Sequence, residues 1–209
     1  MSAIAVETKI ILGFESAGML MTPEEFDEIT EYDDCYRYQL IHGVLVVNPI
    51  PSEAEANPNE ELGHWLRSYK DQHPQGSSLD ATLPERYVRL ASSRRRADRV
   101  IWAGLGRHPE PRVDLPTIVI EFVSSGRRSW RRDYVDKRQE YLALGVSEYW
   151  VIDRFQRTMT VWSKSKAEHQ ERIVQEGQVY TTELLPGFEL PLARLLSAAD
   201  AWQGLRAEG

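Results

Sequence analysis

The chain has 209 residues, a mass of 24.0 kDa and a formal net charge of −7. Its 42% hydrophobic and 27% charged residues are typical of a soluble protein with one sizeable core, and its acidity argues against a purely electrostatic nucleic-acid binder. A single cysteine, Cys35, excludes an internal disulfide, and neither a signal-peptide pattern nor a membrane-length apolar run is seen, so we expect a cytoplasmic protein.

The first half of the chain contains two predicted helices and a predicted hairpin. We expect residues 1–20 to be weakly ordered and residues 21–209 to form a single domain. Thr22-Pro23-Glu24-Glu25 is typical of a helix start, because it combines a capping Thr, a first-turn Pro and two acids, and we expect that helix to run to about Thr30. The later elements are two strands within 36–47, an acidic connection at 52–57 and a helix at 59–72.

The second half alternates predicted strands and helices. In chain order we predict strands at 79–90, 98–103 and 117–124, a helix at 131–144 ended by Gly145, a hairpin of 146–153 and 158–163, a strand pair within 170–183 and a closing helix at 192–201. This order indicates an α/β fold.

Glu121 interrupts an apolar strand, Ile118-Val119-Ile120-Glu121-Phe122-Val123. Alternation places Glu121 on the same face as Val119 and Val123. A buried, ionised carboxylate costs several kcal/mol, roughly, unless a cation or hydrogen-bond donors compensate it. Its partner could be a core arginine in a structural ion pair. Carboxylates of this kind are also frequent at functional sites.

Two further residues follow the order expected of a metal-dependent hydrolase. Asp98 opens one predicted strand, Glu121 lies in the next, and Lys137 lies on the helix that follows, at the edge of its apolar side. Two carboxylates on adjacent strands could hold Mg²⁺ or Mn²⁺, and the lysine could orient a water. A surface ion pair with Asp133, four residues earlier, is the ordinary alternative for Lys137.

Arginines are clustered on both sides of these acids, at 94–96 and at 127–132, while the acids are spread along the chain. We expect both clusters to be loops. Either they are solvated or they contact phosphates, and the candidates for phosphate contact are Arg95, Arg96, Arg128 and Arg131.

The sequence resembles the Uma family of putative restriction endonucleases, a branch of the PD-(D/E)XK nuclease superfamily. The resemblance covers nearly all of the chain from Thr22 to Leu196. The segments that carry it are Tyr38–Gly43, Ala97-Asp98, Ile118–Ser124, Asp133–Tyr141, Gly145–Asp153 and Leu185–Phe188.

This resemblance implies a restriction-endonuclease-like fold, with a central mixed β-sheet flanked by helices. It implies that Asp98 and Glu121 are the metal-binding acids and that Lys137 is the catalytic lysine relocated to the helix, since Val123 occupies the usual lysine position. Gln39 stands where the family pattern usually has Glu, so it would be a peripheral site residue.

Three hypotheses for function follow. The first is a Mg²⁺-dependent or Mn²⁺-dependent endonuclease that hydrolyses DNA phosphodiester bonds, for which a homodimer would allow double-strand cutting. The second is a catalytically inactive, nuclease-derived module that binds nucleic acid or protein, which Gln39 and Ala97 favour. The third is an interaction domain that pairs through the hairpin of Tyr149 to Trp162, with the acids in a core ion pair.

Overall fold

The computed structural model describes residues 10–164 and 169–202. The chain forms two compact units. The first unit comprises residues 1–50 and 89–95, and the second comprises 51–88 and 96–209. The expectation of a single domain over 21–209 stays a prediction. Of the segment expected to be weakly ordered, residues 1–9 lie outside the described residues.

The first unit begins with short elements around one capped helix. Strand β1 (Ile11–Leu12) pairs in parallel with β2 (Glu31–Tyr32), and a 3-10 turn, η1 (Phe14–Ser16), lies between them in sequence. Helix α1 (Pro23–Glu28) has the predicted start: the Glu25 N–H donates to Thr22 Oγ1 at 3.1 Å, and the Thr22 N–H donates to Glu25 Oε2 at 2.7 Å. It ends two residues before the predicted boundary.

The predicted hairpin of the first unit is confirmed as β3 (Tyr36–Ile41) and β4 (Val44–Pro49), which pair antiparallel. His42 and Gly43 make its turn with positive φ values of 49° and 79°. Leu40 of β3 pairs with Arg94, the first residue of strand β6 (Arg94–Ala103), and the Arg94 guanidinium donates to Asp27 of α1.

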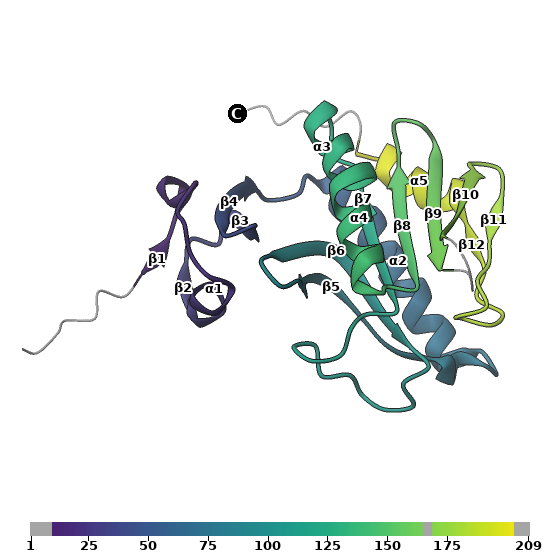
Figure 1. The fold of residues 1–209 in the computed structure, drawn as a ribbon. Helices are drawn as coiled ribbons and strands as arrows, with labels where there is room; N and C mark the ends of the chain where they lie inside the picture. Colours follow the sequence, from purple (N-terminus) through teal and green to yellow (C-terminus); the bar gives the residue numbers. More distant parts are fainter. Residues whose placement is uncertain (1–9, 165–168, 203–209) are drawn as a thin grey trace, which may run out of the picture. The chain divides into compact units, whose positions relative to one another are not determined.

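The second unit contains the main sheet (Figure 1). Its strand order is β10-β9-β8-β7-β6, with β5 also pairing with β6, and β7 and β8 run parallel while the other pairs of known register are antiparallel. The strands are β5 (Leu79–Arg89), β6 (Arg94–Ala103), β7 (Ile118–Phe122), β8 (Glu148–Asp153), β9 (Thr158–Lys164) and β10 (His169–Gln175).

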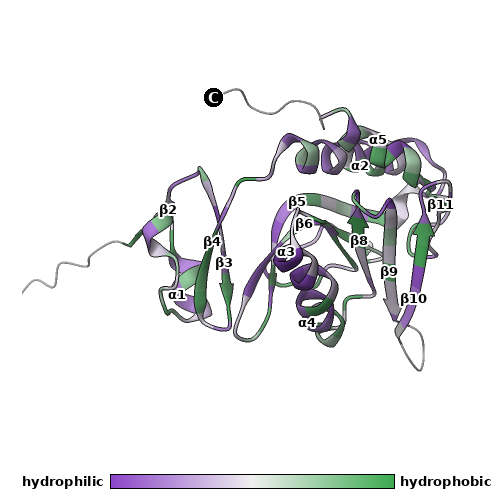
Figure 2. Cartoon of the chain, turned by 90° about the horizontal axis from the view of Figure 1, so that it is seen from above, coloured by the Kyte–Doolittle hydropathy of each residue, from purple (hydrophilic) through white to green (hydrophobic). Residues whose placement is uncertain are grey.

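Helices lie on both faces of this sheet (Figure 2). On one face α2 (Glu53–Gln72) and α5 (Leu192–Asp200) run side by side. The other face carries a continuous helical segment made of α3 (Arg127–Arg131), a π-helical turn, η3 (Arg132–Lys137), and α4 (Arg138–Leu144). Gly145 ends it in the left-handed conformation, as predicted, with φ of 101°. Minor elements are the 3-10 turn η2 (Gly76–Ser78) and the pair β11 (Val179–Tyr180) and β12 (Leu190–Pro191).

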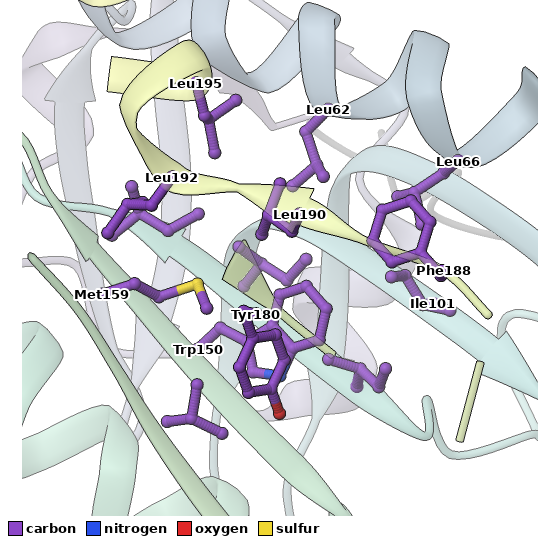
Figure 3. Packing of buried hydrophobic residues seen from close by; sticks show 14 of the residues in the cluster. Leu62, Leu66, Ile101, Trp150, Met159, Tyr180, Phe188, Leu190, Leu192 and Leu195 are labelled. Carbon is purple, nitrogen blue, oxygen red and sulfur yellow. The ribbon is translucent and has the colours of Figure 1, made fainter. Parts of the chain in front are cut away.

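The hydrophobic core lies between the sheet and the α2–α5 layer (Figure 3). Leu62 and Leu66 of α2 and Leu195 of α5 point toward Trp150 and Ile101 of the sheet. Of β7, the side chains of Ile118, Ile120 and Phe122 belong to this core. The alternate residues, including Glu121, therefore face the η3–α4 side, as the alternation predicted.

Several predicted boundaries are wrong. Residues 52–57 belong to the start of α2, where Glu55 accepts hydrogen bonds from the Ser52 N–H and hydroxyl in a capping-box arrangement, and Pro58 lies within the helix. Residues 94–96 begin strand β6, and residues 127–132 are helical, so neither arginine cluster is a loop. The strand pair within 170–183 does not form either: β10 pairs with β9, and β11 pairs with β12.

Candidate active site

Asp98 and Glu121 lie opposite each other on neighbouring antiparallel strands. Arg99 of β6 pairs with Ile120 of β7, so the next residues in register are Asp98 and Glu121, whose side chains share the η3–α4 face. At this point the Phe122 N–H donates to Asp98 Oδ2 at 2.6 Å, which fixes that carboxylate between the two strands. Asp98 is half-buried, whereas Glu121 is fully buried.

Lys137 projects from η3 onto Glu121. Its Nζ donates to Glu121 Oε2 at 2.6 Å and to the backbone carbonyl of Arg96 at 3.1 Å. The Tyr141 hydroxyl, one helical turn later, donates to Glu121 Oε1 at 3.2 Å. Both oxygens of Glu121 are therefore held by side chains of the helix, and Lys137 is 2% exposed, much deeper than the core edge that the sequence suggested.

A third carboxylate, Asp133, belongs to the same cluster. Its Oδ1 lies 3.8 Å from Lys137 Nζ, and it accepts hydrogen bonds from the Arg132 guanidinium at 2.9 and 3.2 Å. The Tyr149 hydroxyl donates to the Asp133 backbone carbonyl at 2.9 Å. The sequence offered Asp133 as a surface partner for Lys137. The structure instead buries both residues beside Glu121, on the face of the helical segment that packs on the sheet.

Negative charge exceeds positive charge in this cluster. Asp98, Glu121 and Asp133 supply three carboxylates, and Lys137 and Arg132 supply two cations. Loss of hydration on burial raises the pKa of Asp98 to about 6, although the Lys137 charge and the Phe122 N–H oppose this. The same loss raises the pKa of Glu121, with Asp98 and Asp133 adding to the effect and Lys137 opposing it. The cluster is thus short of one positive charge.

Residues behind β6 position Asp98 from the α2 side. The Asn59 side-chain amide donates to the Asp98 carbonyl at 2.9 Å, and Asn59 Oδ1 accepts from Arg99 Nε at 2.7 Å. Arg99 is fully buried, and it also donates to the Asn59 carbonyl and to Thr82 Oγ1. Loss of hydration on burial lowers the pKa of Arg99 to about 10, since these acceptors are amide, carbonyl and hydroxyl oxygens and not carboxylates. The sequence analysis missed this network, although an arginine alternating with apolar residues in a strand could have suggested it.

Gly63 is what allows Arg99 to fit. A Cβ at position 63 would lie 2.5 Å from one guanidinium nitrogen of Arg99. Any larger residue would therefore displace the guanidinium that holds Asn59 against the Asp98 backbone.

The four arginines predicted to contact phosphate differ in exposure. Arg128 and Arg131 are exposed on the helical segment, and the Arg131 side chain is 76% exposed. Arg96 is half-buried in an ion pair with Glu85, and Arg95 is 3% exposed. A phosphate role for Arg95 and Arg96 stays a prediction, and burial makes Arg95 the least accessible of the four.

Gln39 belongs to β3 of the first unit and is 6% exposed, whereas Asp98, Glu121 and Lys137 all belong to the second unit. Its predicted peripheral role stays a prediction. In the hairpin expected to mediate pairing, Tyr149, Trp150 and Trp162 are 5% exposed or less, whereas Phe155 in its turn is 53% exposed. The three buried rings are not available to a partner, and pairing through this hairpin stays a prediction.

The donor set suits a hard divalent cation. Asp98 and Glu121 offer carboxylate oxygens, and the missing positive charge is what a divalent ion would supply. Among residues 10–164 and 169–202, no hydrogen-bond donor reaches Asp98 Oδ1, which leaves it free to act as a ligand. Two protein carboxylates are also what Mg²⁺ commonly uses, with water and substrate phosphate completing its coordination.

The central sheet with helices on both faces is a nuclease-like α/β fold. The profile of the Uma2 family, described as "Putative restriction endonuclease", matches residues 23–193, and the chain belongs to this family. A solved structure of a "putative nuclease belonging to DUF820" from Anabaena variabilis shares the fold, with a TM-score of 0.64 and 16% identity over 86% of this chain and 99% of that one. No curated protein matches the chain. No helix in the described part of the chain is long and apolar enough to cross a membrane.

Proposed function

We propose that this protein is an endonuclease that hydrolyses DNA phosphodiester bonds with Mg²⁺ or Mn²⁺. One observation carries the proposal: Asp98 and Glu121 face each other across β6 and β7 with Lys137 Nζ at 2.6 Å from Glu121, in a member of a restriction endonuclease family. A purely structural ion pair would need only one of the two acids.

Asp98 and Glu121 would hold the metal. When bound, Mg²⁺ or Mn²⁺ supplies Lewis-acid activation of a water and stabilises charge that develops on the phosphate. Asp98 presents Oδ1 while its Oδ2 is fixed by the Phe122 N–H. Asp98 is also the half-buried carboxylate of the cluster, since Glu121 and Asp133 are fully buried, so a phosphate would approach from its side.

Lys137 would position the attacking water and stabilise the phosphate oxygens. An ammonium carries three N–H donors, and two of them are directed at Glu121 and at the Arg96 carbonyl. Asp133 Oδ1 lies 3.8 Å from this nitrogen, beyond hydrogen-bond distance, so the third N–H would serve a water or a phosphate oxygen. Because the nitrogen is already oriented by these two contacts, little reorganisation is needed when charge develops.

DNA is the substrate class that the family membership supports. The exposed Arg128 and Arg131 lie on the helical segment that carries Lys137, and they supply positive charge for the phosphate backbone in a chain whose net charge is −7. Cutting both strands would require two sites, which a homodimer could provide.

A second reading is a nuclease-derived module that binds without cleaving. Gln39 replaces the usual family Glu and Ala97 replaces the usual Pro, and these replacements favour it. The two readings differ in turnover and share nucleic-acid binding.

Cleavage of supercoiled plasmid and of single-stranded DNA tests the proposal. Wild type should nick or linearise DNA with Mg²⁺ or Mn²⁺ and not with EDTA. Glu121→Gln and Lys137→Met should lose cleavage, and Glu60→Gln, which alters an exposed acid of α2, should keep it. If folded wild-type protein cleaves no DNA with either ion, the nuclease proposal is refuted and the binding module that does not cleave remains.

A further inference from the structure

An open groove of ≈ 580 Å³ lies on the helical segment that carries Lys137. Its lining consists of Arg127, Trp130, Arg131 and Val135. Trp130 is 43% exposed, although tryptophan side chains are highly buried on average. None of the site chemistry above uses Trp130.

Trp130 is held as a rigid platform. Its ring stacks on Tyr134 with centroids 5.0 Å apart and an interplanar angle of 17°. Tyr134 is fixed in turn, because it packs edge-on against the buried Trp162 at 5.8 Å and donates from its hydroxyl to Asp153. Tyr134 is the ring partner of Trp130 within the described ranges, so the second face of the indole remains for a ligand ring. A pre-ordered platform loses little conformational entropy when a ring stacks on it.

The charges around Trp130 select an anionic ligand. Arg127 and Arg131 line the same groove and are exposed. Asp136 lies 4.0 Å from Arg131 and is itself half-exposed, so this contact neutralises the arginine only weakly. Guanidinium groups beside an exposed aromatic ring match a nucleotide, whose phosphate pairs with arginine and whose base stacks.

The distance between Trp130 and Lys137 indicates whether the bound nucleic acid would be paired or unpaired near Trp130. The two residues are seven positions apart on one continuous helical segment, a distance of roughly 10 Å along its axis. A strand whose phosphate reaches Lys137 would therefore have a neighbouring nucleotide near Trp130. In a paired duplex the bases are stacked inside, so an indole can stack only on an unpaired or flipped base.

We propose that Trp130 stacks on an unpaired base of the DNA strand bound at the active site, with Arg127 and Arg131 on the adjacent phosphates. The preferred substrate is consequently DNA with a single-stranded segment next to the cleaved bond. This inference rests on the proposed nuclease function for its substrate, and it adds a specificity that the acid–lysine cluster does not provide.

Binding measured in EDTA tests the inference without cleavage. The probes are a fluorescein-labelled single-stranded deoxythymidine oligonucleotide and a blunt duplex of equal length, followed by anisotropy. Trp130→Ala should weaken single-strand binding about 5- to 100-fold, which corresponds to the loss of one base–aromatic stack, and change duplex binding less than about twofold. Trp130→Phe should recover part of the loss, because it keeps a smaller stacking face.

Trp202→Ala is the matched control, since Trp202 is similarly exposed at 38% but lies in the turn after α5. It should bind both probes like wild type. Equal affinity of Trp130→Ala and wild type for the single strand, or an equal loss on both probes, would overturn the inference.

Cleavage assays separate this inference from the proposed function. Single-strand binding that depends on Trp130 in a wild-type protein that never cuts would refute the nuclease and keep the stacking platform. Equal cleavage of single-stranded and duplex DNA, unchanged in Trp130→Ala, would keep the nuclease and refute the platform.

Discussion

Removing one charge from the buried cluster should change stability in opposite directions, depending on which charge is removed. Glu121→Gln converts three carboxylates and two cations into a balanced set, whereas Lys137→Met leaves three carboxylates with one cation. An ordinary ion pair behaves differently, because loss of either partner lowers stability.

The magnitudes follow from the charge imbalance. Each unit by which burial raises a carboxyl pKa corresponds to about 1.4 kcal/mol of ionisation cost. We therefore expect Glu121→Gln to increase the free energy of unfolding of the metal-free protein by about 1–3 kcal/mol at pH 8.5, and Lys137→Met to decrease it by about 3–5 kcal/mol. For a protein of this size, 1 kcal/mol shifts Tm by about 2–4 °C.

Thermal unfolding in EDTA, followed by circular dichroism, is the assay. Glu176→Gln provides an ordinary pair as control, since Glu176 bonds the Arg157 guanidinium at the surface, and it should lower Tm slightly. A lower Tm for Glu121→Gln than for wild type at pH 8.5 would refute the charge imbalance and make Glu121–Lys137 a structural ion pair.

Three further predictions concern pH, packing and phosphate contact. Because burial raises the pKa of Asp98 to about 6 and also raises that of Glu121, these carboxyls stabilise the metal-free fold at low pH and lose that contribution as pH rises through 6 and above. The Tm in EDTA should therefore fall from pH 5.5 to 8, while the affinity for Mn²⁺ should rise over the same range. An affinity for Mn²⁺ that does not change with pH would contradict this prediction. Gly63→Ala should lower the free energy of unfolding, measured in urea, by about 1–2 kcal/mol, because the clash with the hydrogen-bonded Arg99 side chain outweighs the gain in helix propensity. A variant as stable as wild type would show that Arg99 can move. Arg131→Gln should weaken DNA binding and reduce its salt dependence by about one unit of slope, and an unchanged slope would exclude a phosphate contact.

The features that were predicted correctly from the sequence follow from hydrophobic periodicity or from a local backbone requirement. Alternation along β7 placed Glu121 on the face opposite Ile120, and the structure has it there. The Thr22 cap and the Gly145 end were also predicted correctly, because each depends on a local backbone requirement. Family membership was recognised from the same segments that the profile match covers.

The rest depended on contacts between distant segments. Asp133 lies in a π-helical turn and is buried there with Lys137, and one extra residue per turn leaves no distinctive composition in the sequence. The Arg99–Asn59 network joins residues forty positions apart, and its space comes from a glycine on α2. The start of α2 was misplaced because the acidic stretch 52–57, which is flanked by Pro51 and Pro58, was interpreted as a connection, although Ser52 and Glu55 form the start signal of that helix.

The most direct test of the proposed site is Mn²⁺ binding to the metal-free protein, measured by calorimetry or by electron paramagnetic resonance at pH 8. Wild type and Glu60→Gln should bind Mn²⁺ alike, while Asp98→Asn and Glu121→Gln should each lose most of that affinity, since each removes a proposed ligand charge. Equal Mn²⁺ affinity in all four proteins would contradict a metal site between Asp98 and Glu121, and with it the proposed mechanism.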